Sequence, residues 1–330
     1  MAGHDIVVIG TSSGGVEALL ALLRDLPEDL QAAVFIVMHR NTYTESNSLA
    51  EVLARSSKLP VEGAKDGLRF EPGRVYVAHP GRHLVLKGDR MLLTRGPREN
   101  RSRPAIDALF RSAALAYGPR VVGVVLTGRL DDGASGLLAI KARGGITVVQ
   151  EPAEATAPEM PCAAIRARRP DLVAPLAAIP EALVRFVARA APSEKDFPAP
   201  SKMADEVRSS EGKVPGMETM EMEGKHTNIV CPDCGGWMVE RAEDHLLLFR
   251  CHTGHVYSQQ TMLAGQSSEL ENQLYRALRV VQELAYLTQR LLEQARAEGR
   301  RDEVEALEHR LSRAESADRA LRVLIEEAAA

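Results

Sequence analysis

Short apolar runs alternate with helical patterns over the first half of the chain. Four almost continuously apolar runs have the length of a strand, and they span 5–9, 33–38, 121–127 and 146–149. Such runs are typical of parallel strands that are covered on both faces. Segments with helical spacing lie among them, at 16–26, 48–56, 104–117 and 133–143. The alternation predicts an α/β domain over residues 1–189, built on a doubly wound, mostly parallel sheet.

Further strand-like segments interrupt this alternation at 74–78, 83–87 and 91–95. Gly88 and Asp89 lie between the last two, and a short turn of this kind predicts a β-hairpin. We therefore expect a local β excursion within the α/β domain.

The pattern changes after residue 189. Residues 190–225 lose periodicity and contain four prolines and eight acidic residues, so they have too little apolar surface to order the chain. They are predicted to be a flexible acidic linker. A small module follows at 226–257. Residues 258–330 are almost free of proline and glycine and carry near-heptad apolar stripes, which predict a helical tail, either a hairpin of two antiparallel helices or a coiled coil.

The formal net charge of −4 conceals an uneven distribution. Residues 1–190 hold 24 basic and 20 acidic side chains, whereas residues 191–330 hold 17 and 25. With 4% aromatic residues, the chain lacks the basic, aromatic-rich surface of a nucleic-acid-binding protein. The longest apolar run, 32–38, is far shorter than the roughly 20 residues that cross a bilayer, so we expect no membrane insertion. The N-terminus does not resemble a signal peptide, which predicts a cytoplasmic protein.

The first predicted strand ends in a small-residue turn, Gly10-Thr-Ser12-Ser-Gly14-Gly, and a helical pattern follows. Gly10-x-Ser12-x-Gly14 fits a nucleophile elbow, in which a tight turn holds a hydroxyl above the sheet. The alternative is a phosphate-binding turn, which would place a glycine two residues after Gly10 and an acid at the end of the second strand. Ser12 and His39 occupy those positions, which disfavours a nucleotide-binding enzyme.

Two further polar groups follow predicted strands. His39 follows the second strand, and Asp131 and Asp132 follow the strand at 121–127. Taken alone, each is more often structural, as a packed histidine or a helix cap. The carboxyl ends of parallel strands share one edge of a sheet, however, so Ser12, His39 and an aspartate are expected to meet there. Serine, histidine and aspartate are the nucleophile, base and orienting residue of many hydrolases.

These motifs resemble the catalytic domain of the chemotaxis protein-glutamate methylesterases over residues 5–188. Several segments carry the resemblance: IGTSSGG at 9–15, VMH at 37–39, RPAIDALF at 103–110, LTG at 126–128 with DGASG at 132–136, and QEPAE at 150–154 leading to Met160-Pro161.

The resemblance implies a serine hydrolase in which Ser12 is the nucleophile, His39 the base and Asp132 the residue that orients the base. Ser13 and Asp131 are the neighbours most easily mistaken for them. The implied substrates are methylated chemoreceptor-type proteins, whose glutamate methyl esters are hydrolysed to release methanol without a catalytic cofactor. Members of the family can also deamidate receptor glutamines.

Two departures from the family pattern stand out. The third loop reads Gly-Arg-Leu130-Asp-Asp-Gly where the family commonly has Gly-Met-Gly-x-Asp-Gly, and losing a glycine is expected to affect substrate fit more than chemistry. Few residues precede the first predicted strand, so we expect the N-terminal receiver domain that is usual in the family to be absent.

The module at 226–257 contains metal-ligand spacing. Cys231 and Cys234 form one pair, and Cys251 and His255 form a second after sixteen residues. Three thiolates and an imidazole are typical of a structural, tetrahedral Zn²⁺ site. His252 and His245 are the alternatives for the fourth ligand, and the reach of Cys-x₃-His favours His255.

The helical tail allows two interpretations. The apolar stripes of its helices pair with a second copy of the chain or with a signalling partner, or the stripes of the two helices cover only each other. For the whole chain, the alternative function is a non-catalytic signalling adaptor that keeps the esterase fold and recruits partners through this tail. An adaptor has no need of Ser12, His39 and Asp132 together, which favours the enzyme.

Overall fold

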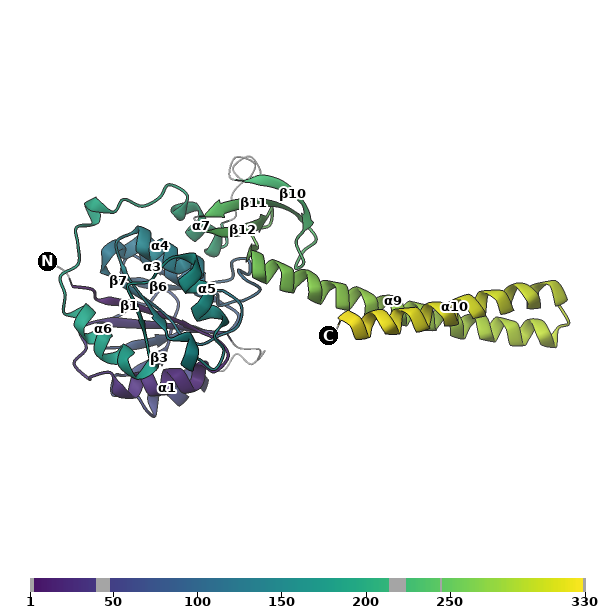
Figure 1. Cartoon of the computed structure of the whole chain (residues 1–330), viewed down its shortest axis with the longest axis horizontal. Coiled ribbons are helices and arrows are strands. Elements are labelled where there is room, and N and C mark those ends of the chain that lie inside the picture. The colour runs from purple at the N-terminus through teal and green to yellow at the C-terminus, as the bar shows by residue number, and fades with distance from the viewer. Residues whose placement is uncertain (1–2, 40–47, 214–223, 244, 329–330) are drawn as a thin grey trace. The chain divides into compact units, whose positions relative to one another are not determined.

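The structure of the chain is a computed structural model that describes residues 3–39, 48–213, 224–243 and 245–328 (Figure 1). By internal contacts the chain divides into two compact units, Met1–Met262 and Leu263–Ala330. The small module at 226–257 therefore belongs to the same unit as the α/β domain.

Seven strands form one sheet among the described residues of the first unit, in the order β3-β4-β2-β1-β7-β8-β9, and every pair is parallel. Their bounds are β1 Ile6–Thr11, β2 Ala33–Met38, β3 Val61–Gly63, β4 Val75–Val77, β7 Val121–Val125, β8 Ile146–Gln150 and β9 Leu172–Ala174. β1 is the central strand of the sheet. The strands that follow it along the chain are added first on one side, beginning with β2, and then on the other side, beginning with β7. This arrangement confirms the expected α/β fold.

Helices cover both faces of this sheet (Figure 1). Successive residues of β1 point to opposite faces: Val7 and Ile9 pack in one apolar cluster, Ile6 and Val8 in the other. The first cluster includes residues of α1 Gly15–Asp25, α2 Ser48–Ala54 and α6 Ile179–Val187. The second includes residues of α3 Ile106–Tyr117, α4 Ala134–Ala142 and α5 Glu159–Ala167. Short 3₁₀ turns lie at Gly118–Arg120, Pro152–Glu154, Leu176–Ala178 and Glu194–Asp196.

The local β excursion is only partly as expected. β5 His83–Lys87 and β6 Arg90–Thr94 form the predicted antiparallel hairpin. β4 instead joins the main sheet between β2 and β3, because Val75, Tyr76 and Val77 are all buried there.

The segment 190–225 also contains more order than a flexible linker. Met203–Ser210 form helix α7, which packs near α3 and buries Met203 and Val207, one helical turn apart. Surrounding serines, acids and prolines conceal this short amphipathic pattern in the sequence. Residues 214–223 lie outside the described residues.

A second, antiparallel sheet forms the small module, in the order β10-β11-β12-β13. Its strands are β10 Lys225–Val230, β11 Trp237–Glu243, β12 Leu246–Cys251 and β13 Val256–Ser258. Met238, Phe249 and Tyr257 fill its core. The module rests on the α/β domain, since the Asn100 N–H donates to the Val256 carbonyl (2.7 Å).

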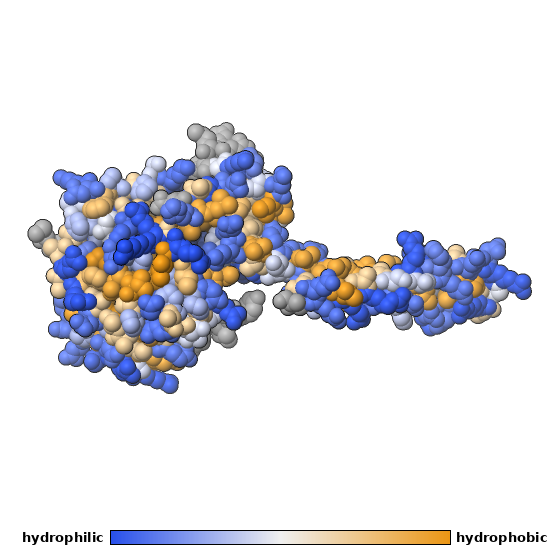
Figure 2. All heavy atoms as spheres, viewed as in Figure 1, coloured by the Kyte–Doolittle hydropathy of each residue, from blue (hydrophilic) through white to orange (hydrophobic). Residues whose placement is uncertain are grey.

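Two long helices, α9 Gln259–Ala297 and α10 Arg301–Ala328, account for the second unit. Gln282 hydrogen-bonds to Asp318 and Arg296 to Glu308, a register that makes the helices antiparallel. Leu292, Ala295 and Leu307 are buried between them near the turn. Figure 2 shows apolar and charged residues side by side along this helical pair. Among the described helices, none is long and apolar enough to cross a membrane.

Candidate active site and metal centre

The central strands bring Ser12, His39 and the Asp132 loop to one edge of the sheet. Ser12 follows β1, and its backbone N–H donates to the Thr127 carbonyl beyond β7 (3.0 Å). The His39 N–H, beyond β2, donates to the Thr11 carbonyl of β1 (3.1 Å). The backbone of Ser12 therefore lies between the two loops that carry the other predicted residues.

Glycines allow these loops to approach closely. A Cβ built on Gly10 would lie 2.3 Å from Ile106 Cγ2, and one on Gly128 would lie 2.1 Å from Met160 Sδ and 2.9 Å from Ser12 Cβ. Real Cβ atoms do not approach their neighbours so closely. Gly10 and Gly128 are therefore required by packing, because a larger residue would prevent helix α3 and the loop after β7 from lying against the end of β1.

His39 and Asp132 are joined directly. His39 Nε2 lies 2.7 Å from Asp132 Oδ2, and their side chains are 17% and 2% exposed. The Ile106 N–H also donates to Oδ2 (2.7 Å), while Asn100 Nδ2 (2.9 Å) and the Asp107 N–H (3.1 Å) donate to Oδ1. Every acceptor position of this buried carboxylate therefore faces a donor.

The charge of Asp132 follows from these contacts. Burial alone would raise the pKa of Asp132, but the hydrogen bonds from His39, Asn100 and the Ile106 N–H outweigh it and lower the pKa to about 2. The side chain is consequently a carboxylate at neutral pH, fixed against one nitrogen of the imidazole.

The adjacent Asp131 has a different environment. Its Oδ1 accepts a hydrogen bond from Ser258 Oγ of the module (2.6 Å). Burial raises the pKa of Asp131 to about 6, despite the Ser258 hydrogen bond. Of the two neighbouring aspartates, Asp132 is the one that contacts His39. The neighbouring serines also differ, because Ser12 is half-buried and Ser13 is exposed.

Two residues of this site had no role in the sequence-based prediction. Asp107 accepts hydrogen bonds from the Gly133 and Gly136 N–H groups (3.0 and 2.6 Å) and so holds the start of α4. Burial and the charge of Asp132 raise the pKa of Asp107 well above its ordinary value. Asn100 donates to both Asp107 and Asp132. Asp107 lies in the RPAIDALF motif, which is a signal for its importance, whereas Asn100 has no comparable signal.

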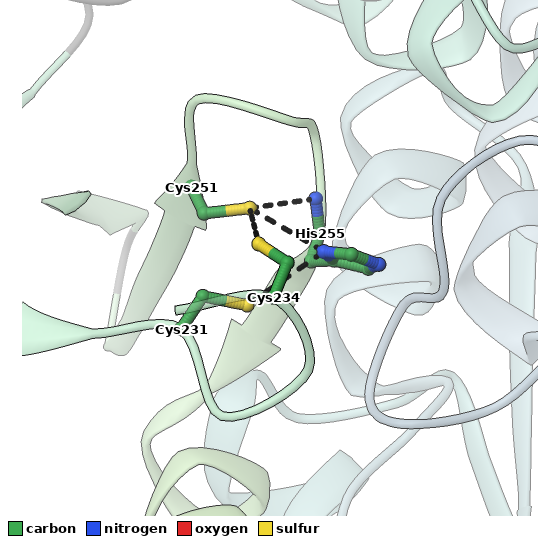
Figure 3. A group of neighbouring side chains, drawn as sticks. All are labelled: Cys231, Cys234, Cys251 and His255. Atoms are coloured by element: carbon green, nitrogen blue, oxygen red, sulfur yellow. Dashed lines mark hydrogen bonds between the residues drawn. The ribbon is translucent and has the colours of Figure 1, made fainter. Parts of the chain in front are cut away.

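The four predicted metal ligands converge in the module (Figure 3). Their ligand atoms all lie within 4.8 Å of one another. Cys234 Sγ and Cys251 Sγ are 3.8 Å apart, and His255 Nδ1 lies 3.5 Å from Cys251 Sγ and 3.6 Å from Cys231 Sγ. Thiolates about 2.3 Å from a tetrahedral metal would be separated by about 3.8 Å. The cluster can therefore hold a metal ion.

The alternative fourth ligands lie elsewhere. The ring of His252 stacks on Trp237, with 5.7 Å between ring centroids and 17° between planes. His245 is exposed in the turn before β12. His255 is the histidine that completes the cluster. The remaining cysteine, Cys162, is half-buried in α5, apart from the other three.

A parallel α/β sheet with a His–Asp pair at its carboxyl edge is an arrangement found in many hydrolases. A family model described as "CheB methylesterase" matches residues 7–183. The chain belongs to the CheB methylesterase family. This confirms the resemblance seen in the motifs and the expectation of a methylesterase-class hydrolase, while the metal cluster and the long helices lie outside the matched residues.

Similar proteins agree with this assignment. A putative protein-glutamate methylesterase/protein-glutamine glutaminase of Leptospira interrogans is 36% identical over 184 residues, which cover 56% of this chain and 95% of that protein. Protein-glutamate methylesterase/protein-glutamine glutaminase 2 of Anaeromyxobacter dehalogenans is 43% identical over 180 residues, 54% of this chain and 52% of that protein. The chain therefore spans about half the length of the second relative.

A solved structure is similar as well. The crystal structure of the Thermotoga maritima CheB methylesterase catalytic domain matches with a TM-score of 0.54 and 34% sequence identity. The match covers 57% of this chain and all of that one. The shared fold corresponds to the α/β domain.

Proposed function

We propose that the chain hydrolyses glutamate methyl esters on methylated chemoreceptor-type proteins and deamidates their glutamines by the same chemistry. The observation that carries this proposal is the hydrogen bond between half-buried His39 and buried Asp132 beside Ser12, at the carboxyl edge of the sheet. Two relatives bear the names of both activities, methylesterase and glutaminase.

In the proposed reaction, His39 accepts the proton of Ser12 as Ser12 Oγ attacks the ester carbonyl. Because Nε2 of His39 is bonded to Asp132, Nδ1 is the nitrogen that takes this proton. Collapse of the tetrahedral intermediate breaks the carbon–oxygen bond, and the imidazolium returns the proton to the departing methanol. His39 then activates water, which attacks the acyl-enzyme, releases the glutamate carboxylate and restores Ser12. Glutamine deamidation differs only in its leaving group, ammonia.

Asp132 and the turn that holds Ser12 provide electrostatic stabilisation in the proposed reaction. Asp132, held as a carboxylate, keeps the imidazole in one orientation and stabilises its charged form. The backbone N–H of Ser13, next to the nucleophile and just before α1, is the proposed donor to the oxyanion.

We further propose that the metal of the module is Zn²⁺. Cys231, Cys234, Cys251 and His255 would hold it through soft thiolates and one imidazole nitrogen. Four protein ligands leave no open position, so the ion would stabilise the module and take no part in ester hydrolysis. Such a crosslink would add to the stability that the small apolar core of the module provides.

The test of the esterase proposal is methanol release from membranes that contain methylated chemoreceptors. The full chain should release methanol, and Ser12→Ala should abolish release while its melting temperature stays near that of the wild type. Ser13→Ala is the matched control and should remain active, because its backbone N–H is retained. Full activity of Ser12→Ala would refute the nucleophile, and an inactive wild type would favour the adaptor alternative.

A further inference from the structure

The carboxamide of Asn100 connects Asp132 to the end of the module. Its Nδ2 donates one proton to Asp132 Oδ1 and one to Asp107 Oδ2, both at 2.9 Å. Its Oδ1 accepts from the Ser258 N–H and from Thr261 Oγ1, both at 3.0 Å. Asn100 is 6% exposed and Thr261 1% exposed, so water does not replace these partners.

The orientation of this amide follows from its partners. A backbone N–H can only donate, so the Asn100 atom that faces the Ser258 N–H must be the oxygen. The nitrogen then necessarily faces the two carboxylates. If the amide turned over, its oxygen would face Asp132 and its NH₂ group would face the Ser258 N–H, and both contacts would be repulsive. The Ser258 N–H and the two carboxyl groups therefore favour the same orientation of Asn100, and the Thr261 hydroxyl adds a second donor to its oxygen.

The module also holds the backbone around Asp132. The Asn100 N–H donates to the Val256 carbonyl (2.7 Å), and Asn100 itself has a left-handed φ of 50°. Ser258 Oγ donates to Asp131, the residue before Asp132. Residues 256–261 thus make hydrogen bonds to both loops that surround the buried carboxylate.

We propose that Asn100 is a positioning residue for Asp132, and that the hydrogen bonds from Ser258 and Thr261 hold Asn100 in place. The inference rests on the proposed hydrolase function and adds a part of the chain to its site. The family model ends at residue 183, so the residues that orient Asn100 come from outside the matched domain. Asn100 acts through Asp132 and His39, so its loss should lower kcat with little effect on KM.

The experiment compares two substitutions at one buried position of the full chain. Thr261→Val keeps the shape of the side chain and removes the donor to Asn100, whereas Thr261→Ser keeps the donor. We expect Thr261→Val to lower kcat for methanol release about tenfold, the effect of one lost hydrogen bond. KM should change by less than about twofold, because Thr261 binds Asn100 and is not proposed to touch substrate. Thr261→Ser should stay within about twofold of the wild type.

A receptor-independent readout accompanies the kinetics. The rate at which a fluorophosphonate modifies Ser12, followed by intact mass, measures the reactivity of the nucleophile without receptor binding. It should fall about tenfold in Thr261→Val and remain near wild type in Thr261→Ser. Asn100→Ala, which removes the donor to Asp132 itself, should lower it about 100-fold.

The outcomes separate this inference from the proposed function. If the wild type is modified at Ser12 and Thr261→Val reacts as fast as the wild type, the Thr261 hydrogen bond to Asn100 is unimportant and only the inference is overturned. If Thr261→Val and Thr261→Ser lose activity equally, or if KM rises with the fall in kcat, the role of Thr261 is merely structural and the inference is again wrong. If Ser12 is not modified and Ser12→Ala still releases methanol, the proposed function fails, and the inference fails with it.

Discussion

Replacing Asp132 by asparagine tests the centre of the proposed site with a change of one atom. Asp132 accepts hydrogen bonds at both oxygens, from His39 and the Ile106 N–H on Oδ2, and from Asn100 and the Asp107 N–H on Oδ1. An amide NH₂ group on the Oδ2 side would face the Ile106 N–H and would require His39 Nε2 to accept, which moves the imidazole proton to Nδ1, the nitrogen that must accept from Ser12. An amide NH₂ group on the Oδ1 side would face two donors, Asn100 Nδ2 and the Asp107 N–H.

The structure sets the size of the effect. The hydrogen bonds that lower the pKa of Asp132 are the ones that an amide cannot all accept. Buried donors that lose their acceptor cost about 1 to 3 kcal/mol each, so we expect the free energy of unfolding to fall by about 2 to 4 kcal/mol. Without a carboxylate to hold the imidazole, kcat should fall about 10³- to 10⁴-fold.

The assay compares Asp132→Asn with Asp131→Asn. Asp131 also lies in the loop and is buried, but its hydrogen bond from Ser258 can be accepted equally well by an amide oxygen. Methanol release and fluorophosphonate labelling should therefore stay within about threefold of the wild type in Asp131→Asn, the effect of less than one hydrogen bond. Urea unfolding at pH 7 gives the stability of all three proteins.

Two results would refute the reasoning. The first is a folded Asp132→Asn variant with wild-type kcat, which would mean that His39 needs no carboxylate. The second is an equal loss of kcat in both variants, which would mean that the charge of the loop matters and the direct His39 contact does not.

Further predictions concern pH and metal. The folded pKa of Asp131, about 6, lies above its ordinary value of 3.8, so its contribution to stability is present below about pH 4 and is lost as pH rises through about 6. Asp131→Asn should therefore gain stability relative to the wild type between about pH 4 and pH 7 in urea unfolding, and an unchanged difference would contradict the raised pKa. For the metal, purified protein should contain about one zinc per chain by elemental analysis. Cys231→Ser should remove the zinc, because Cys231 is one of four converging candidate ligands. Limited proteolysis should then cut within 225–262 much faster than in the wild type, with Cys162→Ser, which lies apart from the cluster, as the unaffected control.

Most of the signals that predict the positions of Ser12, His39 and Asp132 can be found in the sequence. Strand-like runs, the turns that end them and the common edge of parallel strands are local or topological signals, and the structure has the sheet that they predict. The four candidate metal ligands are predicted from their spacing alone, and the structure brings them together.

Other features depend on contacts that no local pattern encodes. Asn100 lies 158 residues from Ser258 along the chain. Its left-handed backbone occurs in a loop whose N–H at Asn100 donates to the Val256 carbonyl. Helix α7 is short, and its apolar face becomes evident only where Met203 and Val207 pack on the domain. Leu130 keeps a φ of 64° where the family commonly has glycine, so the substitution noted in the sequence leaves the loop in a glycine-like conformation.

Strand β13 lies beside the Asp132 loop, and this position has a practical consequence for expressing the protein. A fragment that stops near residue 183, where the family match ends, would lose Val256, Ser258 and Thr261 together. It would leave Asn100 Oδ1 and Asp131 Oδ1 without the partners that they have in the whole chain. Such a fragment keeps every residue of the matched family domain and still has a differently solvated active-site loop. We expect kinetic constants measured on such a fragment to differ from those of the whole chain.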